Sequence, residues 1–247
     1  MKVAIVGKGQ IGSNIEKKMK EKGLDEIITI DVNPETKPDY PTVKEFNRSN
    51  QAKVYIICVL TQKQLTDVVS DIDLTNNPLI SIETACNPDS YKKVKDIVKD
   101  KAKVIVFQER WNPNDDFHSI FNQPRVMGGD YEEGRKFYTR YMMYENIITT
   151  DKPELAALCK IVENAYRFVE ITIAEELKIL TNEDFEELRR LINTKWNINI
   201  AEARDGIGGH CLPKDIKIVD EYFPGNILFS KAILVDKMYK ELIKNGR

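Results

Sequence analysis

The sequence predicts an α/β fold in two parts: a parallel sheet with helices on both faces over residues 1–150, and a long connecting helix with a small all-α domain over residues 151–247. Two observations support this prediction. Short, continuously apolar runs alternate with amphipathic stretches in the first part, which is typical of parallel strands buried on both faces. After Asp151-Lys-Pro153, apolar residues recur at helical spacing over long stretches.

The elements of the first part follow from these alternating patterns. The expected strands are Lys2–Val6, Glu26–Asp31, Lys53–Leu60, Pro78–Glu83, Lys103–Phe107 and Glu145–Thr150. Helical patterns run up to about Lys22 and then over Gln62–Ser70, Asp89–Lys99 and Tyr131–Met143. The segment Val32–Asn50 is rich in Pro, Lys and polar residues, and it predicts an irregular crossover.

The second part is predicted to be helical throughout. Glu154–Leu180 contains neither Gly nor Pro and repeats apolar residues at helical spacing, so a helix of about 40 Å is expected there. Further helices are expected at about Asn182–Asn193 and Ile227–Lys244. A glycine-rich loop, Gly206–Asp215, lies between them.

Composition excludes several classes of protein. Hydrophobic residues make up 42% and charged residues 31%, and the net charge of −2 gives no reason to expect nucleic acid or an anionic membrane as a partner. No apolar run is long enough to span a bilayer, and the first residues do not form a signal peptide. Four cysteines without C-x-x-C spacing and two histidines predict reduced thiols, no metal site and a cytoplasmic protein.

A glycine motif, Gly7-Lys-Gly9-Gln-Ile-Gly12, stands between the first expected strand and the first expected helix. In that context the glycines allow a tight turn and the close approach of a pyrophosphate, as in Rossmann-type domains. Asp31 ends the second expected strand, where a carboxylate binds the ribose hydroxyls of NAD and repels the 2′-phosphate of NADP. The predicted cofactor is NAD, and the predicted binding residues are Gly7, Gly9, Gln10, Ile11, Gly12 and Asp31.

The glycine-rich loop reads Gly206-Ile-Gly-Gly-His-Cys-Leu-Pro-Lys-Asp215. A thiol on flexible backbone beside ionisable groups suits covalent catalysis by sulfur. A glycine-rich turn that carries an ordinary buried cysteine is the alternative, and the segment taken alone favours that alternative.

Three other segments are ambiguous when each is taken alone. Lys160, Asn164 and Arg167 share one face of the long helix, which fits a site or a solvated stripe. Glu109-Arg110 follows an expected strand, where ligands bind in open α/β sheets, but it also fits a surface ion pair. Arg125–Asp130 reads as a turn.

Taken in order, these segments resemble the UDP-glucose/GDP-mannose dehydrogenase family, and nearly the whole chain takes part in the resemblance. Arg125-Val-Met-Gly-Gly is similar to the family's RVxGG segment, and Lys160-Ile-Val-Glu-Asn-Ala-Tyr-Arg167 is similar to its KLxENxxR helix. Asn193-Thr-Lys-Trp-Asn-Ile-Asn-Ile200 and the glycine-rich loop up to Cys211 resemble the UDP-N-acetylhexosamine branch, notably the UDP-N-acetylmannosamine dehydrogenases.

The resemblance implies NAD-dependent oxidation of the C6 alcohol of a nucleotide sugar to the carboxylate. Two hydride transfers take place, and Cys211 forms first a thiohemiacetal and then a thioester. The other implied catalytic residues are Lys160, Asn164, Asp215 and Glu109, and the implied substrate-binding residues are Arg167, Gly208, Gly209 and Lys214. Since the long helix forms the dimer core in the family, a homodimer through residues 154–180 is also expected.

The chain also departs from the family pattern. Relatives continue into a C-terminal UDP-binding domain, whereas this sequence stops at Arg247, so a separately encoded UDP-binding domain is expected as a partner. Gln108 stands where relatives have proline, and Ala85 replaces a threonine in the turn after Glu83. Glu175 occupies a position where relatives often have asparagine.

Two other functions stay open. The chain fits a two-domain NAD-dependent dehydrogenase of a smaller hydroxylated substrate, since the residues that grip the nucleotide are not in this sequence. It also fits a non-catalytic NAD-binding dimerisation module. Retention of Lys160, Asn164, Cys211 and Asp215 together argues against that last alternative, because a structural module does not need all four.

Overall fold

The computed structural model describes residues 1–111, 115, 117–118 and 120–245, and it divides into two compact units, Met1–Lys160 and Ile161–Arg247. The division falls inside helix α6 (Pro153–Thr181), which begins in the first unit and ends in the second. The separation into a domain over residues 1–150 and a domain over residues 151–247 stays a prediction.

The first unit is built on one sheet with the strand order β2-β1-β3-β4-β5-β6-β7. The strands are β1 (Val3–Val6), β2 (Ile27–Ile30), β3 (Val54–Ile57), β4 (Leu79–Ile82), β5 (Lys103–Val106), β6 (Arg125–Gly129) and β7 (Ile147–Thr150). Neighbouring strands are parallel except β5 and β6, which pair antiparallel. The prediction of an α/β Rossmann-type fold is confirmed. The β5–β6 pair departs from the parallel arrangement, and an antiparallel neighbour needs no crossover helix.

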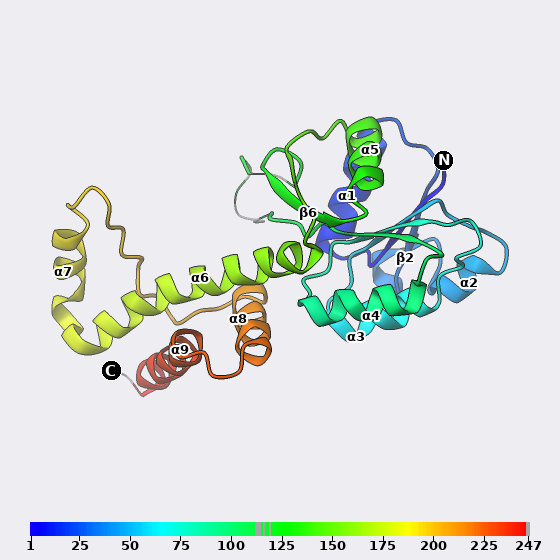
Figure 1. Ribbon diagram of the computed structural model, residues 1–247. Coiled ribbons are helices and arrows are strands. Elements are labelled where there is room, and N and C mark those ends of the chain that lie inside the picture. Colours follow the sequence, from blue (N-terminus) through cyan, green and yellow to red (C-terminus); the bar gives the residue numbers. More distant parts are fainter. Residues whose placement is uncertain (112–114, 116, 119, 246–247) are drawn as a thin grey trace. The chain divides into compact units, whose positions relative to one another are not determined.

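Helices cover both faces of this sheet. Figure 1 shows α3 (Gln62–Ser70) and α4 (Pro88–Val98) on one face, and α1 (Gln10–Glu21) and α5 (Tyr131–Met142) on the other. The two faces have separate apolar cores, one with α3, α4 and the start of α6, the other with α1 and α5. Strands β1, β3 and β4 are buried at every position, as expected for parallel strands between two helical layers.

Local sequence signals fix where these helices begin. The Thr61 side chain accepts a hydrogen bond from the Gln64 N–H, and the Gln64 side chain accepts one from the Thr61 N–H. The two bonds form a capping box at the start of α3. The Asn87 side chain caps α4, and Pro88 occupies the first helical position, where its missing N–H costs nothing. The expected helix over Gln62–Ser70 is confirmed with the same bounds.

The segment Val32–Asn50 is more regular than expected. It contains a short 3₁₀ turn, η1 (Pro34–Thr36), and a short helix, α2 (Val43–Asn47), which Thr42 caps. Phe46 of α2 is fully buried against Tyr40 and Tyr55. The largely polar composition of the segment gave no indication of this buried aromatic packing.

Arg125–Gly129 is a strand, so the interpretation of Arg125–Asp130 as a turn is wrong. The Arg125 side chain is fully buried, and its guanidinium donates to the Glu83 carboxylate and to the Phe107 carbonyl. It also lies 3.9 Å from the centroid of the Phe107 ring. The two glycines of β6 permit close packing, since a Cβ at Gly128 would lie 2.7 Å from Pro153 Cα.

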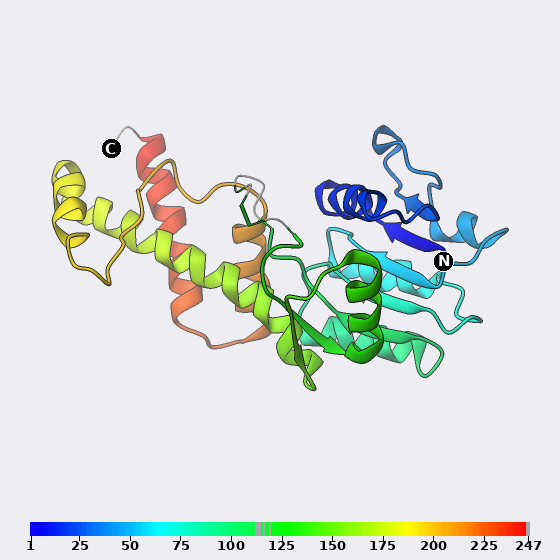
Figure 2. The same ribbon diagram turned by 90° about the horizontal axis from the view of Figure 1, so that it is seen from above.

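The second unit is helical. After α6 come η2 (Asn182–Asp184), α7 (Phe185–Ile192), α8 (Cys211–Tyr222) and α9 (Leu228–Lys244), and Figure 2 shows α8 and α9 beside α6. Helix α8 was not expected, because Cys211–Asp215 read as part of the loop. Of the helices that the structure describes, none is long and apolar enough to cross a membrane.

We predict that Arg125→Met lowers the free energy of unfolding of the first unit by about 3 kcal/mol at about pH 8, because Glu83 is left buried without its cation. The loss shrinks at lower pH, since a protonated Glu83 needs no cation and burial already raises the pKa of Glu83 to about 7. Urea unfolding followed by Trp111 fluorescence in a Trp196→Phe background measures the first unit, because Trp196 is the tryptophan of the second.

The double variant Arg125→Met with Glu83→Gln is the control for this prediction. Its neutral amide needs no cation, so most of the lost stability returns. An equal loss in the single and double variants at both pH values contradicts the prediction.

Candidate active site

The glycine motif forms one wall of a cleft of about 480 Å³ in the first unit. Gly7 has a φ of +94°, and a Cβ there would lie 2.5 Å from the Cys58 carbonyl oxygen. A Cβ at Gly12 would lie 1.9 Å from the Gly7 carbonyl oxygen, so this glycine lets α1 pack on its strand. A Cβ at Gly9 would meet nothing within 4 Å, which leaves its backbone open to a ligand.

The start of α1 suits an anion. Gly9 is the N-cap residue without a side-chain cap, and the first turn has no acidic residue. The first N–H groups of a helix lack intrahelical acceptors, and the helix dipole adds positive potential there. Gln10 and Ile11 therefore present backbone donors suited to a pyrophosphate.

Asp31 is fixed at the edge of the same cleft. Its Oδ2 accepts a hydrogen bond from the Lys8 N–H at 2.6 Å, and its Oδ1 accepts one from the Asn33 N–H at 2.8 Å. Each carboxylate oxygen keeps a further lone pair for a ribose hydroxyl. The geometry of the cleft thus fits a dinucleotide.

Two residues of the cleft were missed from the sequence. Val32 and Leu60 are apolar, line the cleft and are 77% and 65% exposed. Exposed apolar side chains beside a nucleotide-type site suit the flat face of a base. A sequence signal existed, since Val32 and Leu60 closely follow β2 and β3, at the carboxyl edge of the sheet.

Lys160 and Glu109 meet in the first unit. Lys160 Nζ lies 3.8 Å from Glu109 Oε1, and both side chains are about seven-eighths buried. The other carboxylate oxygen of Glu109 accepts a hydrogen bond from the Trp111 N–H. Glu109 is therefore mostly buried and pairs with Lys160.

Asn164, Asp215 and Cys211 belong to the second unit. Asn164 Nδ2 donates to Asp215 Oδ2 at 2.6 Å, and Asp215 is 1% exposed. The other oxygen of Asp215 lies 3.2 Å from Lys214 Nζ. Cys211 is the first residue of α8, one turn before Asp215, and its side chain is exposed.

The exposure of Cys211 bears on the two interpretations of the glycine-rich loop, a reactive thiol or an ordinary buried cysteine. Cys86 is buried and burial raises the pKa of the Cys58 thiol, as expected of structural cysteines, whereas Cys211 is exposed. The loop does not carry an ordinary buried cysteine.

The four predicted substrate-binding residues fall into two places in the second unit. Arg167 and Gly208 line one pocket of about 440 Å³, together with Arg189, Glu175 and the segment from Asn199 to Glu202. Gly209 and Lys214 line a different pocket of about 420 Å³ beside His210. A Cβ at either glycine would meet nothing within 4 Å, so both backbones are open to a ligand. The Arg167 guanidinium lies 2.5 Å from Glu170.

Several curated proteins with similar sequences are UDP-N-acetyl-D-mannosamine dehydrogenases. The central-domain model of the UDP-glucose/GDP-mannose dehydrogenase family matches residues 154–226. The UDP-N-acetyl-D-mannosamine dehydrogenase of Methanocaldococcus jannaschii is 28% identical over 263 residues, in an alignment that covers 87% of this chain. The chain spans 60% of the length of that relative.

Solved structures share the fold. The UDP-D-ManNAc dehydrogenase from Pyrococcus horikoshii superposes with a TM-score of 0.79 at 21% identity, covering 97% of this chain and 69% of that chain. The 3-hydroxyisobutyrate dehydrogenase from Salmonella typhimurium superposes with a TM-score of 0.68 at 14% identity, covering 100% of this chain and 95% of that chain. Residues 154–226 of this chain are thus similar to the central domain of the UDP-glucose/GDP-mannose dehydrogenase family, and the chain as a whole shares the fold of its solved members.

Proposed function

We propose that this chain is an NAD-dependent oxidoreductase of the cytoplasm that converts the C6 alcohol of a nucleotide sugar into the carboxylate. One observation carries the proposal: the exposed thiol of Cys211 begins α8, one turn before a buried carboxylate that Asn164 holds in place. UDP-N-acetyl-D-mannosamine, which the names of the relatives mention, is the first substrate to test.

The cleft of the first unit is the proposed NAD site. Bound NAD supplies the hydride acceptor for both oxidations. The open backbone of Gly9 and the free N–H groups of Gln10 and Ile11 suit its pyrophosphate, and the fixed Asp31 carboxylate suits a ribose without a 2′-phosphate. Gly7 and Gly12 shape the turn that brings these groups together.

Cys211 is the proposed nucleophile. Its sulfur bonds to the C6 carbon of the aldehyde, and the carbonyl oxygen takes up a proton to give a thiohemiacetal. Loss of a hydride and of that proton leaves a thioester. Water then adds to the thioester carbon, the carbon–sulfur bond breaks, and the carboxylate and the thiolate are released.

The other residues of the proposed mechanism have complementary roles. The Lys160 ammonium stabilises negative charge on the reacting oxygen, and Glu109 accepts a proton from the water that hydrolyses the thioester. Asn164 and Asp215 orient water and relay protons. The proposed substrate contacts come from Arg167, Gly208, Gly209 and Lys214, and a separately encoded UDP-binding domain completes the grip on the nucleotide.

A homodimer through residues 154–180 is part of the proposal. Apolar side chains stay exposed along one face of α6: Val162, Tyr166, Ile173 and Leu180 are 37%, 61%, 44% and 73% exposed. Helical geometry puts this stripe on the opposite side of α6 from Asn164. An exposed apolar stripe of this kind suits a second copy of the chain.

A second candidate function is oxidation of a smaller hydroxylated substrate. The observation that favours it is the likeness to the 3-hydroxyisobutyrate dehydrogenase fold over nearly the full length of both chains. Such an enzyme transfers one hydride and has no need of a thiol nucleophile. A binding module without catalysis would show NAD binding and no turnover.

An NADH-production assay over UDP- and GDP-sugars separates these functions. We expect two NADH per sugar and release of the acid, with Cys211→Ala losing acid release by a factor of about 10³ or more. Cys159→Ala is the control, since it makes the same change at a partly buried thiol of α6. One NADH per substrate with a hydroxy acid, or full acid formation by Cys211→Ala, contradicts the thiol mechanism.

The cofactor site has its own test. Gly9→Ala places a methyl group in open space, so we expect unchanged stability but an NAD affinity at least about tenfold weaker, because the backbone can no longer approach the pyrophosphate. Isothermal titration calorimetry measures the affinity. Gly12→Ala is the comparison, since its Cβ collides with the Gly7 carbonyl and lowers stability itself. Unchanged NAD binding by Gly9→Ala would remove the cleft from the proposal.

Light scattering tests the dimer. We expect a dimer at micromolar concentration and a shift to monomer in Ile173→Asp, because a charge in the stripe must be buried on association. Leu234→Asp on α9 is the control, since Leu234 is 45% exposed and Ile173 is 44% exposed. A monomeric wild-type chain at this concentration contradicts the proposed interface.

A further inference from the structure

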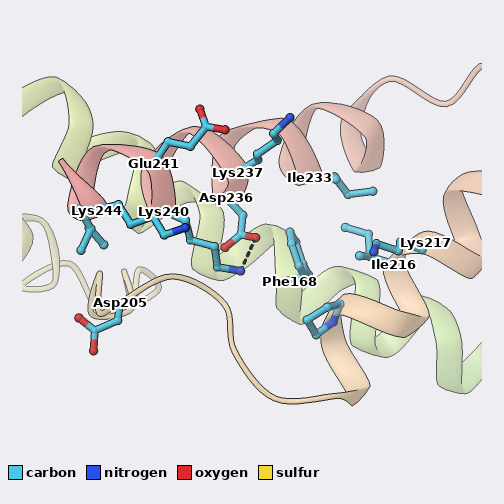
Figure 3. Close-up of a pocket in the computed structure, with 12 residues that line it drawn as sticks. Phe168, Asp205, Ile216, Lys217, Ile233, Asp236, Lys237, Lys240, Glu241 and Lys244 are labelled. Atoms are coloured by element: carbon cyan, nitrogen blue, oxygen red, sulfur yellow. Dashed lines mark hydrogen bonds and ion pairs between the residues drawn. The ribbon is translucent and has the colours of Figure 1, made fainter.

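The glycine-rich loop is held by α9 at a point just before its cysteine. The Ile207 N–H donates to Asp236 Oδ1 at 2.8 Å, and Lys240 Nζ donates to the Ile207 carbonyl at 2.7 Å. Lys240 and Asp236 also pair with each other at 2.8 Å, as Figure 3 shows. The Tyr239 hydroxyl adds a hydrogen bond to the Arg204 carbonyl. Both backbone groups of Ile207 are therefore fixed by side chains one helical turn apart.

Nothing comparable holds the next two residues among those that the structure describes. Gly208 and Gly209 are exposed, and a Cβ on either would meet no atom within 4 Å. A Cβ at Gly206, in contrast, would lie 2.5 Å from the Lys240 side chain. The anchored residue Ile207 thus sets where the backbone enters the turn that leads to Cys211.

The contacts of Asp236 and Lys240 with Ile207 form an anchor for the loop. Glu175 of α6 lies next to this anchor, and its carboxyl has no evident donor partner among the described residues. It is 0% exposed, and no N–H or O–H donor in the described part of the chain reaches either of its carboxyl oxygens. Its carboxyl lies within hydrogen-bonding reach of the Asp236 carboxylate. Two adjacent carboxylates repel, whereas one shared proton turns the pair into a hydrogen bond.

We propose that Glu175, in its protonated form, is a positioning residue for the Cys211 loop, because its carboxyl donates to Asp236 and keeps that side chain on the Ile207 N–H. The inference rests on the proposed function only for its catalytic consequence, since the anchor itself exists without turnover. An asparagine at this position would donate through its amide at any pH. Glu175 makes the same contact dependent on a proton.

Other charged and titratable groups near Glu175 do not replace that proton. From α9, Asp236, Tyr239 and Lys240 act on Glu175 or respond to its charge. The pocket that Glu175 lines is also lined by Arg167 and Arg189, and by Glu202 and Arg204 from the segment before the loop. These four are paired with one another or with nearby glutamates. Burial, the largest cause, and Asp236 raise the pKa of Glu175 to about 7, despite Lys240.

The sign of the pH dependence follows from this shift. A carboxyl whose pKa is raised on folding stabilises the folded contact at low pH and loses it as the pH rises through the raised value. The anchor is therefore intact at about pH 6 and weakened at about pH 8. A negative charge on Glu175 would then stand beside Asp236, and the hydrogen bond to the Ile207 N–H would open more often.

Hydrogen exchange of the segment 204–210 tests the anchor directly. After correction for the intrinsic pH dependence of exchange, we expect protection in the wild-type chain to fall about tenfold between about pH 6 and about pH 8. Glu175→Gln keeps a donor without titrating, so its protection stays constant over this range. Glu176→Gln is the matched control, since it makes the same charge change on the neighbouring, exposed residue and leaves the wild-type response intact.

A second readout links the anchor to catalysis. In the two-NADH assay, the wild-type kcat falls over the same pH range relative to that of Glu175→Gln. If both chains lack turnover while hydrogen exchange behaves as expected, the proposed function fails and the anchor stands. Equal pH responses of wild type and Glu175→Gln in hydrogen exchange overturn the inference, as does loss of the response in Glu176→Gln.

Discussion

The geometry of the first unit depends on one buried charge, the guanidinium of Arg125. It begins β6, donates to the Glu83 carboxylate after β4, and donates to carbonyl oxygens at the end of β5. The Tyr138 hydroxyl of α5 donates to the same carboxylate at 2.9 Å. Since a charge in an apolar core is tolerated only with its partners in place, these elements keep a fixed mutual position. Arg125 also donates to the carbonyl of Gln108, the residue directly before Glu109. The same guanidinium therefore helps to position Glu109 for its contact with Lys160.

The second unit uses the same principle with a different group. There a buried carboxylate, Asp236, grips the backbone of Ile207 from a neighbouring helix. In each unit burial also raises the pKa of a carboxyl, Glu83 or Glu175, to about 7. Neither of these residues belongs to the proposed catalytic set. Each of these two buried carboxyls lies beside a side chain that binds backbone: Glu83 beside Arg125 and Glu175 beside Asp236.

Much of the first unit could be predicted from the sequence, because its signals are local. Continuous apolar runs predicted the strands, and helical spacing predicted the helices over Gln62–Ser70 and Asp89–Lys99, whose starts lie within one residue of the observed ones. The pairing of Glu83 with Arg125 could not be predicted, since 42 residues separate them and each alone suits a turn or a surface. The antiparallel β6 was missed for the same reason: its two glycines suggested a turn, and the distant neighbours that require them, Pro153 and Val104, cannot be read from the local sequence.

The structure brings some of the predicted site residues together, and their surroundings could not be predicted from the sequence. Gly9 and Asp31 line one cleft, and Asn164 contacts Asp215. The start of α8 at Cys211 was missed, because glycines before it and proline after it masked the helical spacing of Leu212, Ile216 and Val219. The role of α9 was also invisible, since nothing in the spacing of Asp236 and Lys240 points to a backbone 29 residues earlier.

The place of Pro213 in the first turn of α8 has a consequence for the entropy of the thiol. Helix ends fray, and a residue at the very first position is the one whose conformation fluctuates most. Proline has a fixed φ that already suits a helix, and in the first turn it has no intrahelical hydrogen bond to lose. It therefore narrows the conformations available to the unwound turn, and the ordered turn loses less entropy when it forms. Cys211 is thereby held ready at a helix end that would otherwise open and close.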